Sequence, residues 1–268
     1  MFSVSLAAAR VEDTTSMGPS DPMRLMAEMD YAQSMYANNQ IEAALALMKA
    51  TYDTVLANYE EKDPIVCSAT SRMSTLYCAS GRPDLALPMD TWVLTNNLVD
   101  GQLSESSVTA GNNLAGTMMQ LAAAYGRTVG PEDVVASAKK EQADFNRLAL
   151  LLWQRTLSYN EEQEYSPATE DYLIKGNVGN LHSDMGNHDL ALPLLESALS
   201  ICRRRFGDSH VETYYTKRDL AAALFCATGH HARAKGLMEA AVAGLTAAFG
   251  SDCEIVVMCT ELQSRHVQ

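Results

Sequence analysis

Apolar residues along this chain recur at the spacing of an α-helix and not in the alternating order of a β-strand. In residues 189–201, four of them follow one another at intervals of 4, 4 and 3: Leu190, Leu194, Ala198 and Ile201. This spacing predicts a stripe on one helix face, which must pack against a neighbour to leave water. The chain is rich in Ala, Leu and Met and poor in aromatic residues, which also favours helix. We therefore predict an all-α protein.

The same pattern returns several times. Residues 189–201 (DLALPLLESALSI) align without gaps with residues 84–89 (DLALPM) and residues 147–159 (RLALLLWQRTLSY). One alanine column then runs through five segments, with separations of 42, 63, 42 and 43 residues: Ala44, Ala86, Ala149, Ala191 and Ala234. The separations reduce to a period of about 42 with one insertion of about 21. Self-similarity of this kind is typical of a solenoid, in which neighbouring repeats bury each other's apolar faces.

Two recurring turns divide each period into two helices, A and B. Five residues before the alanine stands a residue that tolerates the positive φ of a helix C-terminus: Asn39, Gly81, Gly186 or Gly229. Fifteen residues after it, an aromatic residue closes three of the repeats: Tyr59, Phe206 and Phe249. The period and its recurring turns predict five repeats, at about 23–63, 64–105, 106–167, 168–210 and 211–252.

Three segments do not follow the 42-residue period, and we predict the structure of each separately. The insertion, residues 126–140, falls in the third repeat, and its second half extends helix B at the front. Residues 253–266 are apolar enough for a final capping helix. Residues 1–20 are expected to be a flexible lead-in, so residues 21–268 form a single domain.

The fourth repeat carries a family resemblance. Residues 186–201 (GNHDLALPLLESALSI) and 206–210 (FGDSH) resemble the roughly 42-residue tetratricopeptide (TPR) repeat of kinesin light chains. Those units run Gly-x-x-x-x-Ala-x-Pro-Leu, Ala-Leu-x-Ile and Leu-Gly-x-(Asp/Glu)-His-Pro, and residues 112–115 (NNLA) resemble the same family's Asn-Asn-Leu-Ala. The match is strong over residues 168–252 and weaker over 23–167. It implies a right-handed superhelical solenoid of about five TPR-like repeats.

Two departures limit what the resemblance implies. Val211 stands where the family has proline, and the sequence contains no heptad pattern like the coiled coil by which a light chain joins its motor subunit. A role as motor subunit is therefore not expected.

The charge of the chain limits the classes of partner it can bind, and its cysteines indicate the cellular compartment. The formal charge is −13, and residues 1–200 hold 26 Asp/Glu against 12 Lys/Arg. A negative field repels phosphate backbones and anionic lipid, so we expect a protein or peptide partner, basic or neutral, with no nucleic acid and no membrane insertion. The six cysteines form no CxxC pair and no disulfide framework. This usage predicts an intracellular, cytoplasmic setting.

Signatures of catalysis are missing from the sequence. It has no P-loop, no Gly-x-Gly-x-x-Gly, no Gly-x-Ser-x-Gly and no His-Glu-x-x-His. Residues 137–140 (SAKK) fit Ser-x-x-Lys, but the companion motifs of that enzyme class are absent. His188 and His231 lie one period apart, yet solvated turn histidines are commoner than metal ligands. We expect no enzyme, no cofactor and no metal.

Polar residues eight to twelve positions before the A–B turns are expected to line a concave groove together with Asp30. They are Arg72, Asn112, Asn113, Lys175, Asn177, Asn180, Lys217 and Arg218. Asn offers a donor and an acceptor to a peptide backbone, and Lys or Arg can hold a carboxylate. The hypothesis is a protein–protein interaction scaffold or adaptor that binds a peptide segment of a partner. The alternative is a regulatory or oligomerising repeat region of a larger enzyme or signalling protein.

Overall fold

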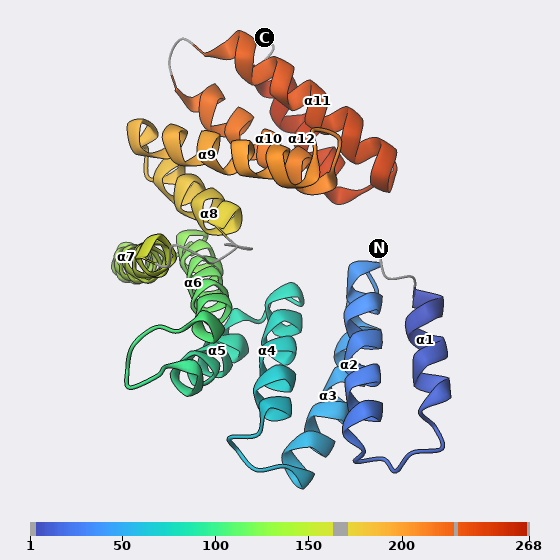
Figure 1. The fold of residues 1–268 in the computed structure, drawn as a ribbon. Helices are drawn as coiled ribbons and strands as arrows, with labels where there is room; N and C mark the ends of the chain where they lie inside the picture. The colour runs from blue at the N-terminus through green and yellow to red at the C-terminus, as the bar shows by residue number, and fades with distance from the viewer. Residues whose placement is uncertain (1–3, 163–170, 228–229, 267–268) are drawn as a thin grey trace. The chain divides into compact units, whose positions relative to one another are not determined.

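The structure is a computed structural model that describes residues 4–162, 171–227 and 230–266. Within these ranges twelve helices form and no β-strand does, which confirms the all-α prediction (Figure 1). The helices are α1 (Val4–Asp13), α2 (Pro22–Ala37), α3 (Ile41–Asn58), α4 (Pro64–Ala79), α5 (Pro83–Asn97), α6 (Glu105–Gly126), α7 (Glu132–Glu162), α8 (Asp171–Asp184), α9 (His188–Phe206), α10 (Val211–Cys226), α11 (His231–Phe249) and α12 (Glu254–His266).

The chain divides into two compact units, unit 1 (residues 1–152) and unit 2 (residues 153–268). In unit 1, α2 packs on α3 and α4 on α5, and in unit 2, α8 packs on α9 and α10 on α11. Tyr125 of α6 stacks on Phe145 of α7, with ring centroids 5.8 Å apart. These are the predicted helix pairs, so α2, α4, α6, α8 and α10 are A helices and α3, α5, α7, α9 and α11 are B helices. One continuous domain over residues 21–268 stays a prediction.

The turn residues adopt the backbone conformation expected of them. Asn39 has φ 61°, Gly81 has 75° and Gly186 has 79°, all in the left-handed region that ends a helix. Gly229 lies outside the described residues. A substitution with a β-branched residue at these positions would strain the turn between helix A and helix B.

The alanine column lies in the core of the helix pairs. All five residues, Ala44, Ala86, Ala149, Ala191 and Ala234, are 0% exposed. The buried stripe of α9 differs from the prediction, because Leu190 is 56% exposed. The core side of α9 is the neighbouring line of residues, also at helical spacing: Ala191, Leu195, Ala198 and Cys202.

The N-terminal segment corrects an expectation. Residues 4–13, expected to lie in a flexible lead-in, form α1, which packs on α2 with Ala7 buried. The physical reason is that the run of three alanines before Arg10 favours helix, and that Ala7 among them becomes buried.

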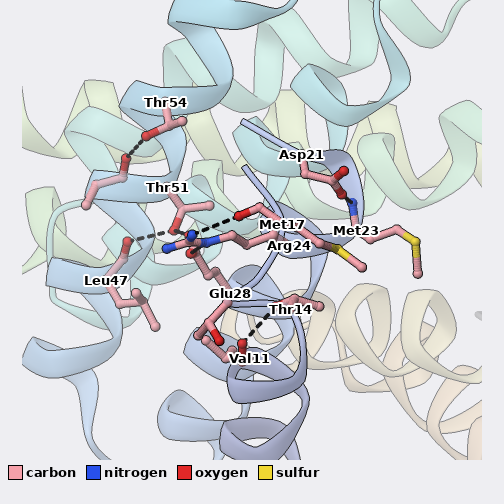
Figure 2. Close-up of polar contacts among 12 residues, drawn as sticks. Val11, Thr14, Met17, Asp21, Met23, Arg24, Glu28, Leu47, Thr51 and Thr54 are labelled. Carbon is pink, nitrogen blue, oxygen red and sulfur yellow. Dashed lines mark hydrogen bonds and ion pairs between the residues drawn. The ribbon is translucent and has the colours of Figure 1, made fainter. Parts of the chain in front are cut away.

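Polar contacts fix the segment between α1 and α2 (Figure 2). Arg24 of α2 donates to the Met17 carbonyl at 3.4 Å and to Glu28 Oε1 at 3.0 Å. Thr51 of α3 donates to Glu28 Oε2 at 3.0 Å. Arg24 and Glu28 therefore join the loop before α2, α2 itself and α3.

The insertion and the C-terminal segment are mostly helical. α7 begins at Glu132 and runs for 31 residues, so the second half of residues 126–140 lengthens a B helix at its front. α12 occupies the segment expected to cap the repeats, and its Val256 and Cys259 join the core of unit 2.

Two glycines of α8 predict opposite effects of the same substitution. A Cβ at Gly179 would lie 2.7 Å from Leu195 Cγ and 3.3 Å from the Ala191 carbonyl oxygen, whereas a Cβ at Gly176 meets nothing within 4 Å. We expect Gly176→Ala to stabilise unit 2 by about 0.5–1 kcal/mol through helix propensity. Gly179→Ala should destabilise it by a net ~1 kcal/mol because overpacking outweighs the same gain. Urea unfolding of both variants measures this, and equal shifts would contradict the packing of α8 on α9.

Candidate functional site

The A-helix face is the surface of each unit formed by the polar side chains of its neighbouring A helices. α2 lies beside α4, and α4 beside α6, in unit 1, while α8 lies beside α10 in unit 2. Side chains about one period apart meet there. Arg72 donates to Asp30 Oδ1 at 2.9 Å, Asn113 to Ser71 Oγ at 3.4 Å, and Asn180 to Asp219 Oδ2 at 3.1 Å. Residues about one period apart in the sequence thus form hydrogen bonds between neighbouring A helices.

In unit 1 this face contains a cleft centred on Asp30, which we call the Asp30 cleft. The guanidinium of Arg10 lies 3.5 Å from Asp30 Oδ2, on the other side from Arg72. The cleft has a volume of about 490 Å³ and is lined by α1, α2 and α4 through Leu6, Ala7, Arg10, Asp30, Gln33, Ser34, Ala37, Asn38 and Arg72. Two guanidinium groups share one carboxylate, so the site has an excess of positive charge beside an apolar wall. Such a site can accept a carboxylate and an apolar side chain together.

The charges of the Asp30 cleft remain in contact with water. The side chain of Arg72 is 26% exposed and that of Asp30 is 36% exposed. Ion pairs of this kind contribute at most about 1 kcal/mol to stability. They are therefore available for a ligand and can be removed without unfolding the chain.

In unit 2 the face is centred on Asp219. Its carboxylate accepts from Asn180 of α8 and, at 2.8 Å, from Arg218 Nε of its own helix. The guanidinium of Arg218 also lies 5.4 Å from the centroid of the Tyr215 ring. Lys175 and Asn177 lie on the same helix as Asn180, and both are partly exposed. The contacts hold Arg218 in one place, which limits the ordering cost of binding a ligand.

Lys217 corrects the prediction, because it does not line an open surface. Its side chain is 4% exposed, and its ammonium group donates to the backbone oxygen and to the Oδ2 of Asp208, each at 2.9 Å. The ammonium also lies 5.0 Å from the centroid of the Tyr214 ring. Lys217 and then Arg203 hold the pKa of the Asp208 carboxyl below its ordinary value through hydrogen bonds. Lys217 therefore fixes the turn between α9 and α10.

Three residues of the face were not predicted: Arg10, Ser71 and Asp219. Arg10 was missed because its helix was expected to be flexible. Ser71 adjoins the predicted Arg72 and lies one period before Asn113. Asp219 adjoins the predicted Arg218 and lies about one period after Asn180. This spacing was the sequence signal that could have identified both residues. Asn112 is partly exposed beside Asn113. Seven of the eight predicted positions thus lie at least partly in solvent, and their role in binding stays a prediction.

The described ranges also bear on metal binding and on membrane insertion. Among those residues no group of three or more His, Cys, Asp or Glu side chains could hold a metal ion. None of the helices in these ranges is both long and apolar enough to cross a membrane.

Comparison with known proteins gives two kinds of likeness. Residues 171–247 match the family profile of the tetratricopeptide repeat. No curated protein matches the chain. The solved structures with a similar fold include a Podosopora anserina kinesin light chain protein with nearly identical TPR-like repeats (Q17M form), and BtubC (BKLC) from P. vanneervenii.

The structural likeness extends over most of the chain. The Podosopora protein is 17% identical, with a TM-score of 0.57, covering 86% of this chain and 97% of that one. BtubC is 19% identical, with a TM-score of 0.58, covering 92% of this chain and 91% of that one. At this identity the likeness concerns the fold, and it confirms the predicted repeat class.

Proposed function

We propose that this chain, which carries tetratricopeptide repeats and has the fold of kinesin light chain repeats, is a scaffold that binds a peptide segment of a partner protein along its A-helix face. The Asp30 cleft is the observation that carries the proposal. It joins an apolar wall with two ion pairs of Asp30, with Arg10 at 3.5 Å and with Arg72 at 2.9 Å, and the helices of Asp30 and Arg72, α2 and α4, share one core.

The chemistry of the face suits an extended peptide. Arg10 and Arg72 can hold a carboxylate, and the Asn113 amide has both a donor and an acceptor for a peptide backbone. Leu6 and Ala37 supply an apolar wall for a neighbouring side chain. In unit 2, Arg218, Asn180 and Asp219 repeat the combination of cation, amide and carboxylate.

The role we propose is non-catalytic, and we place the protein inside the cell. All six cysteines are free, and two of them, Cys202 and Cys259, are buried, where burial raises the pKa of each thiol. Thiols of this kind are unreactive and suit a reducing compartment.

The experiment selects peptides from a random displayed library against the full chain and measures their Kd. We expect Arg72→Ala to raise the Kd of a peptide that occupies the Asp30 cleft by about tenfold, a typical cost of losing a central charged contact. Asn113→Ala should weaken binding by a smaller factor.

Arg82→Ala is the matched control in the same unit. Arg82 also forms an ion pair with an aspartate, at 2.9 Å from Asp84, but it lies in the turn before α5 and away from the cleft lining. The proposal would be overturned if the selected peptides bound all four face variants as tightly as the wild-type chain. These variants are Arg72→Ala and Asn113→Ala in unit 1, and Asn180→Ala and Arg218→Ala in unit 2.

A further inference from the structure

A second cleft, which we call the Trp92 cleft, lies in unit 1 between the B helices α3 and α5 and shares no residue with the Asp30 cleft. It has a volume of about 420 Å³ and is lined by Tyr52, Leu56, Tyr59, Glu61, Val66, Thr70, Pro88, Met89 and Trp92. Three of these described side chains are aromatic, one is acidic and none is basic. We infer that the Trp92 cleft binds an arginine or lysine side chain of a basic peptide segment.

The walls of the Trp92 cleft are held in place without a ligand. Its floor is α4, where Val66 and Thr70 are almost completely buried. The Tyr59 hydroxyl donates to the Ser20 carbonyl at 2.7 Å, and the Tyr52 hydroxyl oxygen lies 3.5 Å from Thr70 Oγ1. Because these rings are already ordered, binding costs little further side-chain entropy. The volume lies in the range of about 300–1,000 Å³ that is usual for ligand sites.

The contact between Trp92 and Glu61 determines the kind of ligand. The indole Nε1 donates to Glu61 Oε1 at 3.0 Å, so the carboxylate lies at the edge of the indole ring. A cation placed over the face of this ring gains a cation–π interaction and is within reach of the same carboxylate. The planar guanidinium of arginine can stack on the ring and donate to the carboxylate at once, so arginine should bind better than lysine.

Charge and space around the cleft agree with a basic segment. Residues 1–152 contain 18 Asp/Glu against 10 Lys/Arg, a formal charge of −8 that attracts a basic partner. A neighbouring cleft of about 690 Å³ shares Glu61 and Trp92. The residues that flank the bound arginine can therefore continue along the surface of unit 1.

A titration of the full chain with two short peptides tests this inference. The probes are acetyl-Gly-Gly-Arg-Gly-Gly-amide and its citrulline analogue, which keeps the shape of arginine and removes its charge. The chain has two tryptophans and hence two indole N–H signals in NMR spectra, of which Trp92→Phe assigns one. We expect the arginine peptide to shift the Trp92 signal saturably, and the citrulline peptide to bind about fivefold or more weakly.

Glu61→Gln should weaken the arginine peptide by a similar factor, and Glu60→Gln is the matched control because Glu60 is exposed and does not line the cleft. Arg72→Ala should leave this titration unchanged, so failure of the A-helix face and failure of the Trp92 cleft are distinguishable. Equal binding of the two peptides, equal effects of the two glutamine variants, or no saturable shift would overturn the inference. So would a pentaproline peptide that binds more tightly, since aromatic grooves also take polyproline segments.

Discussion

Asp208→Ala is expected to destabilise unit 2 by about 2–3 kcal/mol, the largest effect of any single substitution considered for this chain. The variant leaves the ammonium of Lys217 buried without its carboxylate partner, and breaking a buried ion pair in this way costs about 3–5 kcal/mol. We expect a smaller value because the side chain of Asp208 is 63% exposed, so water can partly replace it. The backbone oxygen of Asp208 also remains an acceptor.

Hydrogen exchange measured by mass spectrometry locates the effect of Asp208→Ala. Exchange should become faster in α10 and in the last turn of α9, while the segments of unit 1 keep their protection. The double variant Lys217→Met/Asp208→Ala should recover most of the loss, because methionine keeps an apolar stem and brings no charge into the core. A double variant as unstable as Asp208→Ala alone would show that the buried charge is not the cause.

The same pair predicts a pH dependence. Because Lys217 and Arg203 lower the pKa of the Asp208 carboxyl, the folded chain binds this proton less tightly than the unfolded chain. The stabilisation from Asp208 is therefore present above the ordinary aspartate pKa, about 3.9, and is lost as the pH falls through the lowered pKa.

Asp90→Asn is expected to stabilise unit 1 by about 2 kcal/mol at neutral pH, since a buried charge without a cation costs several kcal/mol. Asp90 of α5 is 2% exposed. Thr117 donates to its Oδ2 at 2.6 Å, and the hydroxyl of Ser74 acts with that of Thr117 to lower the pKa of the Asp90 carboxyl against the effect of burial. An asparagine can accept from Thr117 and donate its amide to Ser74 Oγ, so no polar group loses its partner.

The sign of the pH effect at Asp90 is opposite to that at Asp208. Burial raises the pKa of the Asp90 carboxyl, with the two hydroxyl hydrogen bonds acting against it. The contribution of this group to stability is complete below about pH 3.9 and is lost as the pH rises through the raised pKa. Urea midpoints of wild-type and Asp90→Asn chains should therefore coincide near pH 4 and separate as the pH rises.

Asp84→Asn is the control for Asp90→Asn, because Asp84 lies on the same helix but is exposed. Its pKa is lowered, first by the hydrogen bond from Arg82, so its pH dependence has the other sign. A difference between wild-type and Asp90→Asn chains that is constant with pH would contradict the raised pKa of the Asp90 carboxyl.

Period and turn chemistry were sufficient to predict the helix pairs of both units. The alanine column identifies five core positions directly, since all five of its residues are 0% exposed. The left-handed turns follow from Asn39, Gly81 and Gly186 in the same way. The buried face of α9 was missed by one residue, because Leu190 and Ala191 both begin a stripe at helical spacing and only the neighbouring helices decide between them.

The candidate site was less predictable, because a residue's position on a helix does not reveal its partners. Lys217 and Arg218 are adjacent and similar in sequence, yet one is buried against Asp208 and the other is half-buried beside Asp219. Because lysine is rarely buried, the sequence favoured an exposed position for Lys217, which the structure contradicts. The Trp92 cleft combines residues of α3, the following turn, α4 and α5, and only the folded chain shows that Glu61 meets Trp92.

Photo-crosslinking most directly tests the claim that the A-helix face binds a peptide. Peptides selected against the full chain would carry a photoreactive residue, and mass spectrometry would locate the attached positions. We predict attachment to α2, α4 or α6 near Asp30 and Arg72 in unit 1, or to α8 or α10 near Asn180 and Arg218 in unit 2. Attachment confined to B helices, the Trp92 cleft included, or spread evenly over the surface, would contradict the claim that the A-helix face binds a peptide.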